Sequence, residues 1–364
     1  MVVSLEPIVN SVLNQFEIRG EFAAIAPYGS GHINETYCAT FLDDGRPRRV
    51  ILQRINSEIF KNPIALMKNI QRTTSHLAAR IQGHPDSERR VLRLISAYDG
   101  QCWHVDPSGH YWRVYDFVEN SRTYDAVESA EQAYQAAKAF GSFQRDLVDL
   151  SPPRLGETIP NFHHTPQRLE ALEHAIAADV TNRASMAGPE IDFVLSRRAM
   201  VSVLLDANLP ERVTHNDTKL NNVLLDNTTG EAVCVIDLDT VMPGLAPFDF
   251  GDMVRTTTSP AKEDEQDLSR VVMQYSMFEA IVRGYFEGAD GFLTKEEKNH
   301  LVLAGKLITF EQGIRFLTDY LAGDSYYKTH REGHNLDRCR TQFKLIESIE
   351  EQEEKMERLV RSIG

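Results

Sequence analysis

The sequence predicts an α+β protein with two lobes, in which a small antiparallel β lobe precedes a larger, mainly helical lobe that carries one central β-hairpin. Three observations support this prediction. Short runs of β-branched and aromatic residues, separated by turn residues, dominate the chain up to about residue 119. Apolar residues recur at helical spacing from Ser129 onward. Two apolar runs, Val223–Leu225 and Ala232–Ile236, then interrupt the helical part and enclose a turn-forming segment.

The first lobe follows an amphipathic segment at the N-terminus, which lacks the basic start and the unbroken apolar stretch of a signal peptide. Three strands are expected next, at Phe22–Tyr28, Glu35–Leu42 and Arg49–Ile55. Asp43-Asp44-Gly45 favours a tight turn between the second and third strands. We therefore expect an antiparallel meander.

A helix over Pro63–Ala79 should separate this meander from a second hairpin. In that hairpin, Gln101–Val105 and Tyr111–Val118 flank the turn-forming segment Asp106-Pro107-Ser108-Gly109. The hinge should lie near Phe117–Asn120, which divides the chain into residues 1–119 and 120–364.

The second lobe should contain several helices around its central hairpin. Thr165-Pro166 is typical of a helix start, with Thr165 as the N-cap. Further helices are expected at 189–207, 262–287, 295–321 and 340–362. The charge-laced segment Leu345–Ile363 should be a surface helix. Together, these elements have the outline of a protein-kinase-like fold.

The bulk composition excludes several classes of partner. The 364-residue chain has a formal net charge of −14, which disfavours binding to nucleic acid or to anionic lipid. No segment approaches the apolar length that spans a bilayer. The four cysteines are scattered without metal spacing, which favours reduced thiols and a cytoplasmic location. We expect a monomer or a weak homo-oligomer.

The strongest chemical signal is the pattern HxDxKxxN, which begins at His215 and ends where the central hairpin begins. Phosphoryl transfer requires a group that orients the attacking alcohol and accepts its proton, together with cations that neutralise the phosphates. Asp217 is the candidate base, Lys219 can reach the transferred phosphoryl group, and Asn222 can bind a metal ion. This pattern predicts a kinase that uses ATP.

The far strand of the same hairpin should supply a second metal ligand. Asp237 ends that strand, so the hairpin should return it to Asn222, and carboxylate and amide oxygens suit Mg²⁺. By strand alternation, Asp239 should point the same way and help with a second ion. The nearby Asp249-Phe250-Gly251 spells the metal-binding DFG of protein kinases. Asp249 fits better as a helix cap or as a brace for the catalytic loop.

Nucleotide contacts are expected from the first lobe. The turn between the first two strands would cover the phosphates through its flexible backbone, although an ordinary hairpin turn is an equally good interpretation of such a string. The candidate residues of this turn are Gly29, Gly31, His32 and Asn34. Adenine should lie against the hinge backbone at Phe117 and Val118. Gln53 occupies the third-strand position where protein-kinase-like enzymes usually carry a phosphate-gripping lysine.

These motifs resemble those of the aminoglycoside phosphotransferase/choline kinase superfamily. Within it, the segments at Tyr28–Asn34, Thr214–Asn222, Ile236–Thr240 and Arg315–Leu321 resemble bacterial N-acetylhexosamine 1-kinases. The resemblance spreads over almost the whole chain. It implies ATP- and Mg²⁺-dependent phosphorylation of the anomeric hydroxyl of N-acetylglucosamine or N-acetylgalactosamine. In this interpretation residues 1–119 bind the nucleotide, and residues 120–364 carry catalysis and the sugar.

The resemblance also implies which residues hold the acceptor sugar. Arg315 and Tyr326 match sugar-binding positions, and Thr218 is assigned to the acceptor as well. Without the resemblance, Arg315 would fit an ordinary ion pair equally well. Two other functions remain open at this point, namely a kinase for another alcohol, such as an aminoglycoside or a choline-like compound, and a pseudokinase that binds nucleotide without turnover.

Overall fold

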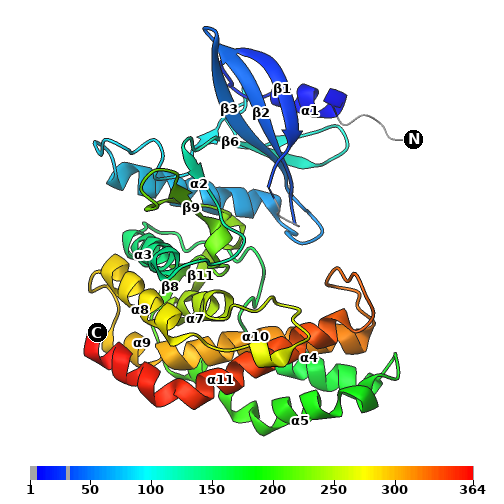
Figure 1. Ribbon diagram of the computed structural model, residues 1–364. Coiled ribbons are helices and arrows are strands. Elements are labelled where there is room, and N and C mark those ends of the chain that lie inside the picture. The colour runs from blue at the N-terminus through cyan, green and yellow to red at the C-terminus, as the bar shows by residue number, and fades with distance from the viewer. Residues whose placement is uncertain (1–5, 30–32, 364) are drawn as a thin grey trace.

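The computed structural model describes residues 6–29 and 33–363, which form two lobes, one above the other in Figure 1. The first lobe contains α1 (Glu6–Leu13), β1 (Glu21–Pro27), β2 (Glu35–Asp43), β3 (Arg46–Arg54), α2 (Pro63–Arg80), β4 (Leu94–Ile95), β5 (His104–Val105) and β6 (Tyr111–Asp116). The strands form one antiparallel sheet in the order β1-β2-β3-β6-β4, and β5 pairs with β6. Asp44 and Gly45 adopt positive φ between β2 and β3, as the tight turn requires.

The second lobe is mainly helical and encloses two small sheets. Its helices are α3 (Ala130–Asp146), α4 (Thr165–Ala178), α5 (Gly188–Ser196), α6 (Val203–Asp206), α7 (Ala246–Thr257), α8 (Tyr275–Ala289), α9 (Lys295–Asn299), α10 (Leu301–Ala322) and α11 (His334–Ile363). Its strands are β7 (Ser121–Arg122), β8 (Glu211–Thr214), β9 (Val223–Asp226), β10 (Ala232–Val235) and β11 (Met242–Leu245). The sheets are β10-β9-β7 and β11-β8. The chain therefore leaves the first sheet after β6 and joins a second-lobe sheet at β7.

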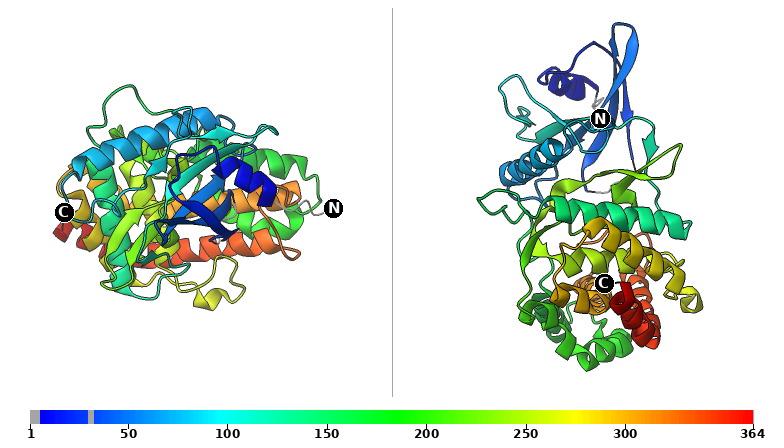
Figure 2. Two further views of the ribbon diagram at one scale, coloured as in Figure 1. Left: turned by 90° about the horizontal axis from the view of Figure 1, so that it is seen from above. Right: turned by 90° about the vertical axis from the view of Figure 1, so that its left-hand side faces the viewer.

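Close helix packing forms the core of the second lobe. A Cβ atom added to Gly284 or Gly288 of α8 would lie 2.2 Å from the carbonyl oxygen of Tyr134 or 2.1 Å from that of Lys138 on α3. Only glycine allows this approach, so α3 and α8 are held together along their length. α10 and α11 pack side by side across the base of the lobe, as Figures 1 and 2 show.

Helix α2 lies between the sheet of the first lobe and the second lobe (Figure 1). Its buried Asn69 donates from Nδ2 to the carbonyl oxygens of Gly156, at 2.7 Å, and Val241, at 3.1 Å. The Gly156 N–H donates back to Asn69 Oδ1 at 3.0 Å. Leu66 and Leu238 belong to one hydrophobic cluster that joins α2 to the second lobe. The core thus continues across the sequence boundary at residues 119 and 120.

The structure confirms the predicted fold class, a protein-kinase-like α+β fold with two lobes and a central hairpin. Four short strands, β4, β7, β8 and β11, were not predicted, because two- to four-residue segments carry little periodicity. His164, rather than Thr165, caps α4, because the Thr165 hydroxyl donates to Glu311 at 2.7 Å. The predicted surface helix at the C-terminus is part of α11, which buries apolar residues along one face.

The segment predicted as one helix over 262–287 is helical only from Tyr275. Asp264 instead binds His334 at 3.0 Å, and Asp267 accepts from the Ser269 N–H at 3.2 Å in a short 3₁₀ turn. Such side-chain hydrogen bonds compete with the backbone hydrogen bonds of a helix, so the segment before Tyr275 does not continue α8. In the described residues all four cysteines are free, and no helix has the length and apolarity to cross a membrane.

Candidate active site

The catalytic loop runs from the end of β8 to the start of β9, and the carboxylate of Asp249 is hydrogen-bonded to its backbone. Asp249 lies in the first turn of α7 and is fully buried. It accepts from the backbone N–H of His215 at 2.9 Å, the N–H of Asn216 at 2.7 Å and Gln144 Nε2 at 2.5 Å. Asn216 has a φ of 65°, a left-handed conformation that asparagine tolerates better than most residues. Asp249 is therefore a brace for the catalytic loop.

Thr218, expected at the acceptor, faces the protein interior instead. Its N–H donates to Asp252 Oδ2 at 2.8 Å, and its hydroxyl donates to the carbonyl oxygen of Asp249 at 2.6 Å. Its side chain is buried. The residue thus ties the loop to α7, and we assign it no acceptor contact.

Asp217 lies in the catalytic loop, and its carboxylate is held by one amide group and one ammonium group. Asn222 Nδ2 donates to Asp217 Oδ2 at 2.9 Å, and Lys219 Nζ lies 3.0 Å from the same oxygen. Burial alone would raise the pKa of Asp217, but the charges of Lys219 and His215 and the hydrogen bonds from Lys219 and Asn222 outweigh it and lower the pKa. The carboxylate is therefore ionised at neutral pH and can accept a hydrogen bond from an alcohol.

The hairpin of β9 and β10 brings Asp237 back to Asn222. Val235 pairs with Val223, and the Ile236 N–H donates to the carbonyl oxygen of Asn222 at 2.9 Å. Asp237 follows with a φ of 60°, and its side chain is open to solvent. Partial desolvation, together with the charges of Asp239 and Asp217, raises the pKa of Asp237 to about 6.

These residues fit a divalent cation that is also bound by phosphate. In the described part of the chain the Asp237 carboxylate accepts no hydrogen bond, and the like charges of Asp239 and Asp217 act on it more strongly than the opposite charge of Lys219, so an added cation would relieve their repulsion. No group of three or more His, Cys, Asp or Glu side chains in residues 6–29 and 33–363 is arranged to hold a metal ion. The protein would thus supply Asn222 and Asp237, while phosphate and water complete the shell, as Mg²⁺ prefers.

Asp239 does not lie beside Asp237 on a strand, because β10 ends at Val235 and a 3₁₀ turn follows Asp237. Its buried carboxylate forms an ion pair with Arg113 of β6. Asn34 Nδ2 donates to the other oxygen at 2.5 Å. Both carboxylate oxygens of Asp239 are thus bound by donors from the first lobe. Asp239 is therefore not placed as the ligand of a second metal ion that the sequence predicted.

Arg113 was not foreseen from the sequence, yet it is a buried cation directly beside the expected lysine position. It is 1% exposed and pairs across the sheet with Gln53 of β3. Gln53 Oε1 accepts from Arg113 Nε at 2.9 Å and from Nη2 at 2.8 Å, while Gln53 Nε2 donates to Thr36 at 3.0 Å. Gln53 thus orients a cation instead of carrying one. The signal that could have pointed to Arg113 is an arginine placed between the aromatic and apolar residues Trp112 and Val114 inside a strand.

The other nucleotide candidates are only partly described. Gly29 has a φ of 79°, as expected of a turn, whereas Gly31 and His32 lie outside the described residues. At the hinge, the Phe117 N–H donates to the carbonyl oxygen of Arg49 at 3.2 Å. Val118 packs with Val233 and Cys234 in a small apolar cluster between the lobes. The cluster offers an apolar surface beside the hinge.

Arg315 and Tyr326 line one cavity of about 490 Å³. Its walls come from the segment after β3, the segment before α4, α4, α10 and the loop after α10, and include Glu58, Phe162, Arg168, Asp319 and Tyr327. The neighbour of Phe162, His163, links the cavity to the catalytic loop, because its Nε2 lies 3.4 Å from the carbonyl oxygen of Asn216. The cavity therefore lies beside the catalytic loop.

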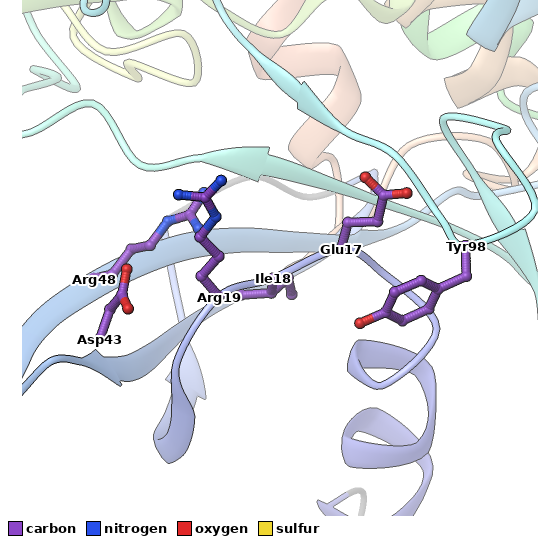
Figure 3. A pocket seen from close by; sticks show the side chains of 6 residues that line it. All are labelled: Glu17, Ile18, Arg19, Asp43, Arg48 and Tyr98. Atoms are coloured by element: carbon purple, nitrogen blue, oxygen red, sulfur yellow. The ribbon is translucent and has the colours of Figure 1, made fainter.

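A second cavity, of about 580 Å³, lies on the first lobe (Figure 3). Its side chains come from the segment after α1, from β2, from β3 and from the segment after β4. Arg48 at its edge is paired with Asp116 at 2.7 Å. All of its lining residues belong to the first lobe, and no hydrogen bond or ion pair joins them to the catalytic loop among the described residues, so we assign it no part in the chemistry.

Solved structures of several other proteins have a fold similar to that of this chain. The chain is similar in structure to a microcompartment-associated aminopropanol kinase (TM-score 0.61, 15% identity, 96% of this chain and 98% of that one covered). It is similar to a choline kinase from Cryptosporidium parvum (0.57, 13%, 99% and 99%). It is also similar to a spectinomycin phosphotransferase in complex with ADP and spectinomycin (0.54, 12%, 100% and 99%). At these identities the likeness shows a shared fold.

The family profile is more specific than these structural likenesses. The profile described as the phosphotransferase enzyme family matches residues 24–283, well over half of the chain. The match spans the sheet of the first lobe, the catalytic loop, the central hairpin and α7. The chain belongs to the phosphotransferase enzyme family.

Proposed function

We propose that the protein is an ATP-dependent, Mg²⁺-dependent small-molecule kinase that phosphorylates the anomeric hydroxyl of N-acetylhexosamines. The observation that carries the kinase chemistry is the convergence of Asp217, Asn222 and Asp237 at one end of the β9–β10 hairpin. The sugar assignment is supported by the sequence motifs shared with N-acetylhexosamine 1-kinases. A cavity lined by Arg315 and Tyr326 beside the loop also supports it.

In this proposal each residue of the loop has one task. Asp217, ionised and fixed by Asn222, orients the acceptor hydroxyl and takes its proton as the bond from the hydroxyl oxygen to the γ-phosphorus forms, while the bond from that phosphorus to the bridging oxygen breaks and ADP leaves. Lys219, 3.0 Å from Asp217, is placed to neutralise charge on the transferred phosphoryl group. Asn222 and Asp237 would hold Mg²⁺, which, when bound, neutralises phosphate charge.

The two lobes divide the substrates between them. Residues 1–119 would hold the nucleotide, with adenine against the apolar cluster at Val118 and the phosphates below the turn that ends at Asn34. Residues 120–364 would hold the acceptor. The ADP found in the related spectinomycin phosphotransferase supports the choice of ATP as donor.

The test is ATP consumption with and without N-acetylglucosamine, together with NMR of the product to locate the phosphate at C1. Asp217→Asn should reduce kcat by about 10²- to 10⁴-fold, the range for losing a general base, while the thermal melting curve stays unchanged. Asp290→Asn, at the exposed end of α8, is a matched control that should keep full activity. ATP binding with turnover of an aminoglycoside or a choline-like alcohol but of no sugar would favour a kinase for another alcohol, and ATP binding without turnover of any alcohol would favour a pseudokinase.

A further inference from the structure

The cavity beside the catalytic loop contains two arginines, Arg168 of α4 and Arg315 of α10, and neither is paired with a carboxylate in the described part of the chain. Arg315 Nη1 donates to Gln312 Oε1 at 3.1 Å. Its Cζ also lies 5.7 Å from the ring centres of Phe162 and Tyr327. All of these partners are uncharged, so the charge of Arg315 is not neutralised by an ion pair.

Arg168 likewise has no ion-pair partner in the described part of the chain. Its Nη2 donates to the carbonyl oxygens of Asn161, at 3.2 Å, and Phe162, at 2.9 Å. Its Nε is buried without a hydrogen-bond partner among the described residues. Burial, and then the charge of Arg315, lower the pKa of Arg168 despite the nearby Glu311. Arg168 is therefore a partly buried cation with one unused donor and no ion-pair partner in the described part of the chain.

The two buried acidic residues near the cavity are committed to other hydrogen bonds. Asp319 accepts from the N–H groups of Ser325, Tyr326 and Tyr327 and from Asn335 Nδ2, all within 2.9 Å. Its carboxylate therefore shapes the loop after α10. Glu311 binds His163 at 2.9 Å and Thr165 at 2.7 Å. Glu58 is exposed, so water screens its charge.

We propose that Arg168 and Arg315 act together as a specificity pair, which accepts alcohols that carry an uncharged or anionic oxygen group, acyl or carboxylate, and excludes alcohols that carry an ammonium there. The inference rests on the proposed function only for the location of the acceptor. Guanidinium groups bind oxygen acceptors with planar, paired donors. An ammonium in the same place would add a third positive charge to a site whose buried carboxylates are already hydrogen-bonded and whose remaining carboxylate, Glu58, is exposed to water.

Three sugars that share a ring and an anomeric hydroxyl and differ only in the group on C2 test this proposal: N-acetylglucosamine (acyl), N-oxalylglucosamine (carboxylate) and glucosamine (ammonium). Assayed below the pKa of the sugar amine, the wild-type protein should show a kcat/KM for the first two at least about tenfold above that for glucosamine, which corresponds to about 1.4 kcal/mol. Arg168→Glu should raise the value for glucosamine and lower the value for N-oxalylglucosamine. Arg168→Gln should narrow the difference between them.

Arg198→Gln is a matched control, because Arg198 is largely exposed and pairs with Glu173 at 3.3 Å away from the cavity. It should leave the order of the three sugars unchanged. Thermal melting shows whether Arg168→Glu is folded, and if it is not, Arg168→Gln decides. Equal use of glucosamine and N-acetylglucosamine by the wild type would overturn the proposal, as would an unchanged order in a folded Arg168 variant.

Failure of the proposed function has a different signature. Turnover of N-oxalylglucosamine without turnover of any N-acetylhexosamine would reject the sugar assignment and support the arginine pair. If none of the sugars is phosphorylated, calorimetric titration of the protein with each sugar measures the same preference as binding. Tighter binding of glucosamine than of N-oxalylglucosamine would then reject the pair.

Discussion

The buried arginine of the first lobe and the two arginines of the acceptor cavity differ in what surrounds them. Arg113 is almost fully enclosed and has a carboxylate partner, Asp239, as well as two hydrogen bonds to Gln53. Arg168 and Arg315 are less buried and have only uncharged partners. A buried arginine with a full set of partners holds the architecture together, whereas an arginine without a counter-charge retains its capacity to bind a ligand. The predictions below test this difference.

The largest expected effect is on stability, at the buried pair. Arg113→Met would leave the carboxylate of Asp239 buried without its counter-charge, at a cost of about 3–5 kcal/mol of unfolding free energy. Urea unfolding measures it. Arg54→Met is the control, because Arg54 forms a partly exposed pair with Glu35 of the neighbouring strand, and the variant should lose at most about 1 kcal/mol of unfolding free energy. Similar losses for the two variants would contradict the structural role of Arg113.

A second variant of the same pair sharpens this test. Asp239→Leu added to Arg113→Met removes the stranded charge, so the double variant should be more stable than Arg113→Met alone. If the double variant is less stable than the single one, the loss in Arg113→Met comes from packing and not from charge.

The next effect concerns the loop brace. Asp249→Asn replaces one carboxylate oxygen by an NH₂ group that must face a backbone N–H or Gln144, at a cost of about 1–3 kcal/mol in stability. Because the loop positions Asp217, kcat should fall more than either KM rises. Steady-state kinetics and thermal melting measure the two effects separately. An unchanged kcat in a destabilised protein would show that the brace does not set the geometry of the base.

The smallest expected effect lies in the cavity. Arg315→Gln keeps hydrogen-bonding capacity but removes the charge, so the acceptor KM should rise about tenfold, or about 1.4 kcal/mol, without loss of stability. The KM for ATP should stay the same. Equal changes in both KM values would place Arg315 in lobe closure and not in acceptor binding.

The parts of the site that were predicted from the sequence depend on contacts between residues close in the chain. The turn of the central hairpin is local, since Asp226 Oδ1 accepts from the N–H groups of Thr228, at 2.7 Å, and Thr229, at 3.0 Å. Once the hairpin is known, the nearness of Asp237 and Asn222 follows. The role of Asp249 as a brace for the loop was likewise among the alternatives that the sequence left open.

The parts that were missed depend on contacts between distant segments. Arg113 lies 126 positions from Asp239 and 60 from Gln53, and nothing local to any of them reveals the network. Thr218 sits in the catalytic motif, yet α7 determines its orientation. The segment 262–274 has helical composition, but Asp264 binds His334, 70 positions away, instead. In each case a tertiary partner overrides a local preference.

The packing of α2 has a mechanical consequence. Because Asn69 is hydrogen-bonded to the backbone at Gly156 and Val241, α2 is anchored to the second lobe although its sequence belongs to the first. Any rocking of the β-sheet over the catalytic loop must therefore bend the segments on either side of α2, at Ile55–Asn62 and Ile81–Arg93, while the helix itself stays still. Those two segments and the hinge segment Phe117–Asn120, which joins β6 to β7, are therefore where the chain would bend when the sheet moves.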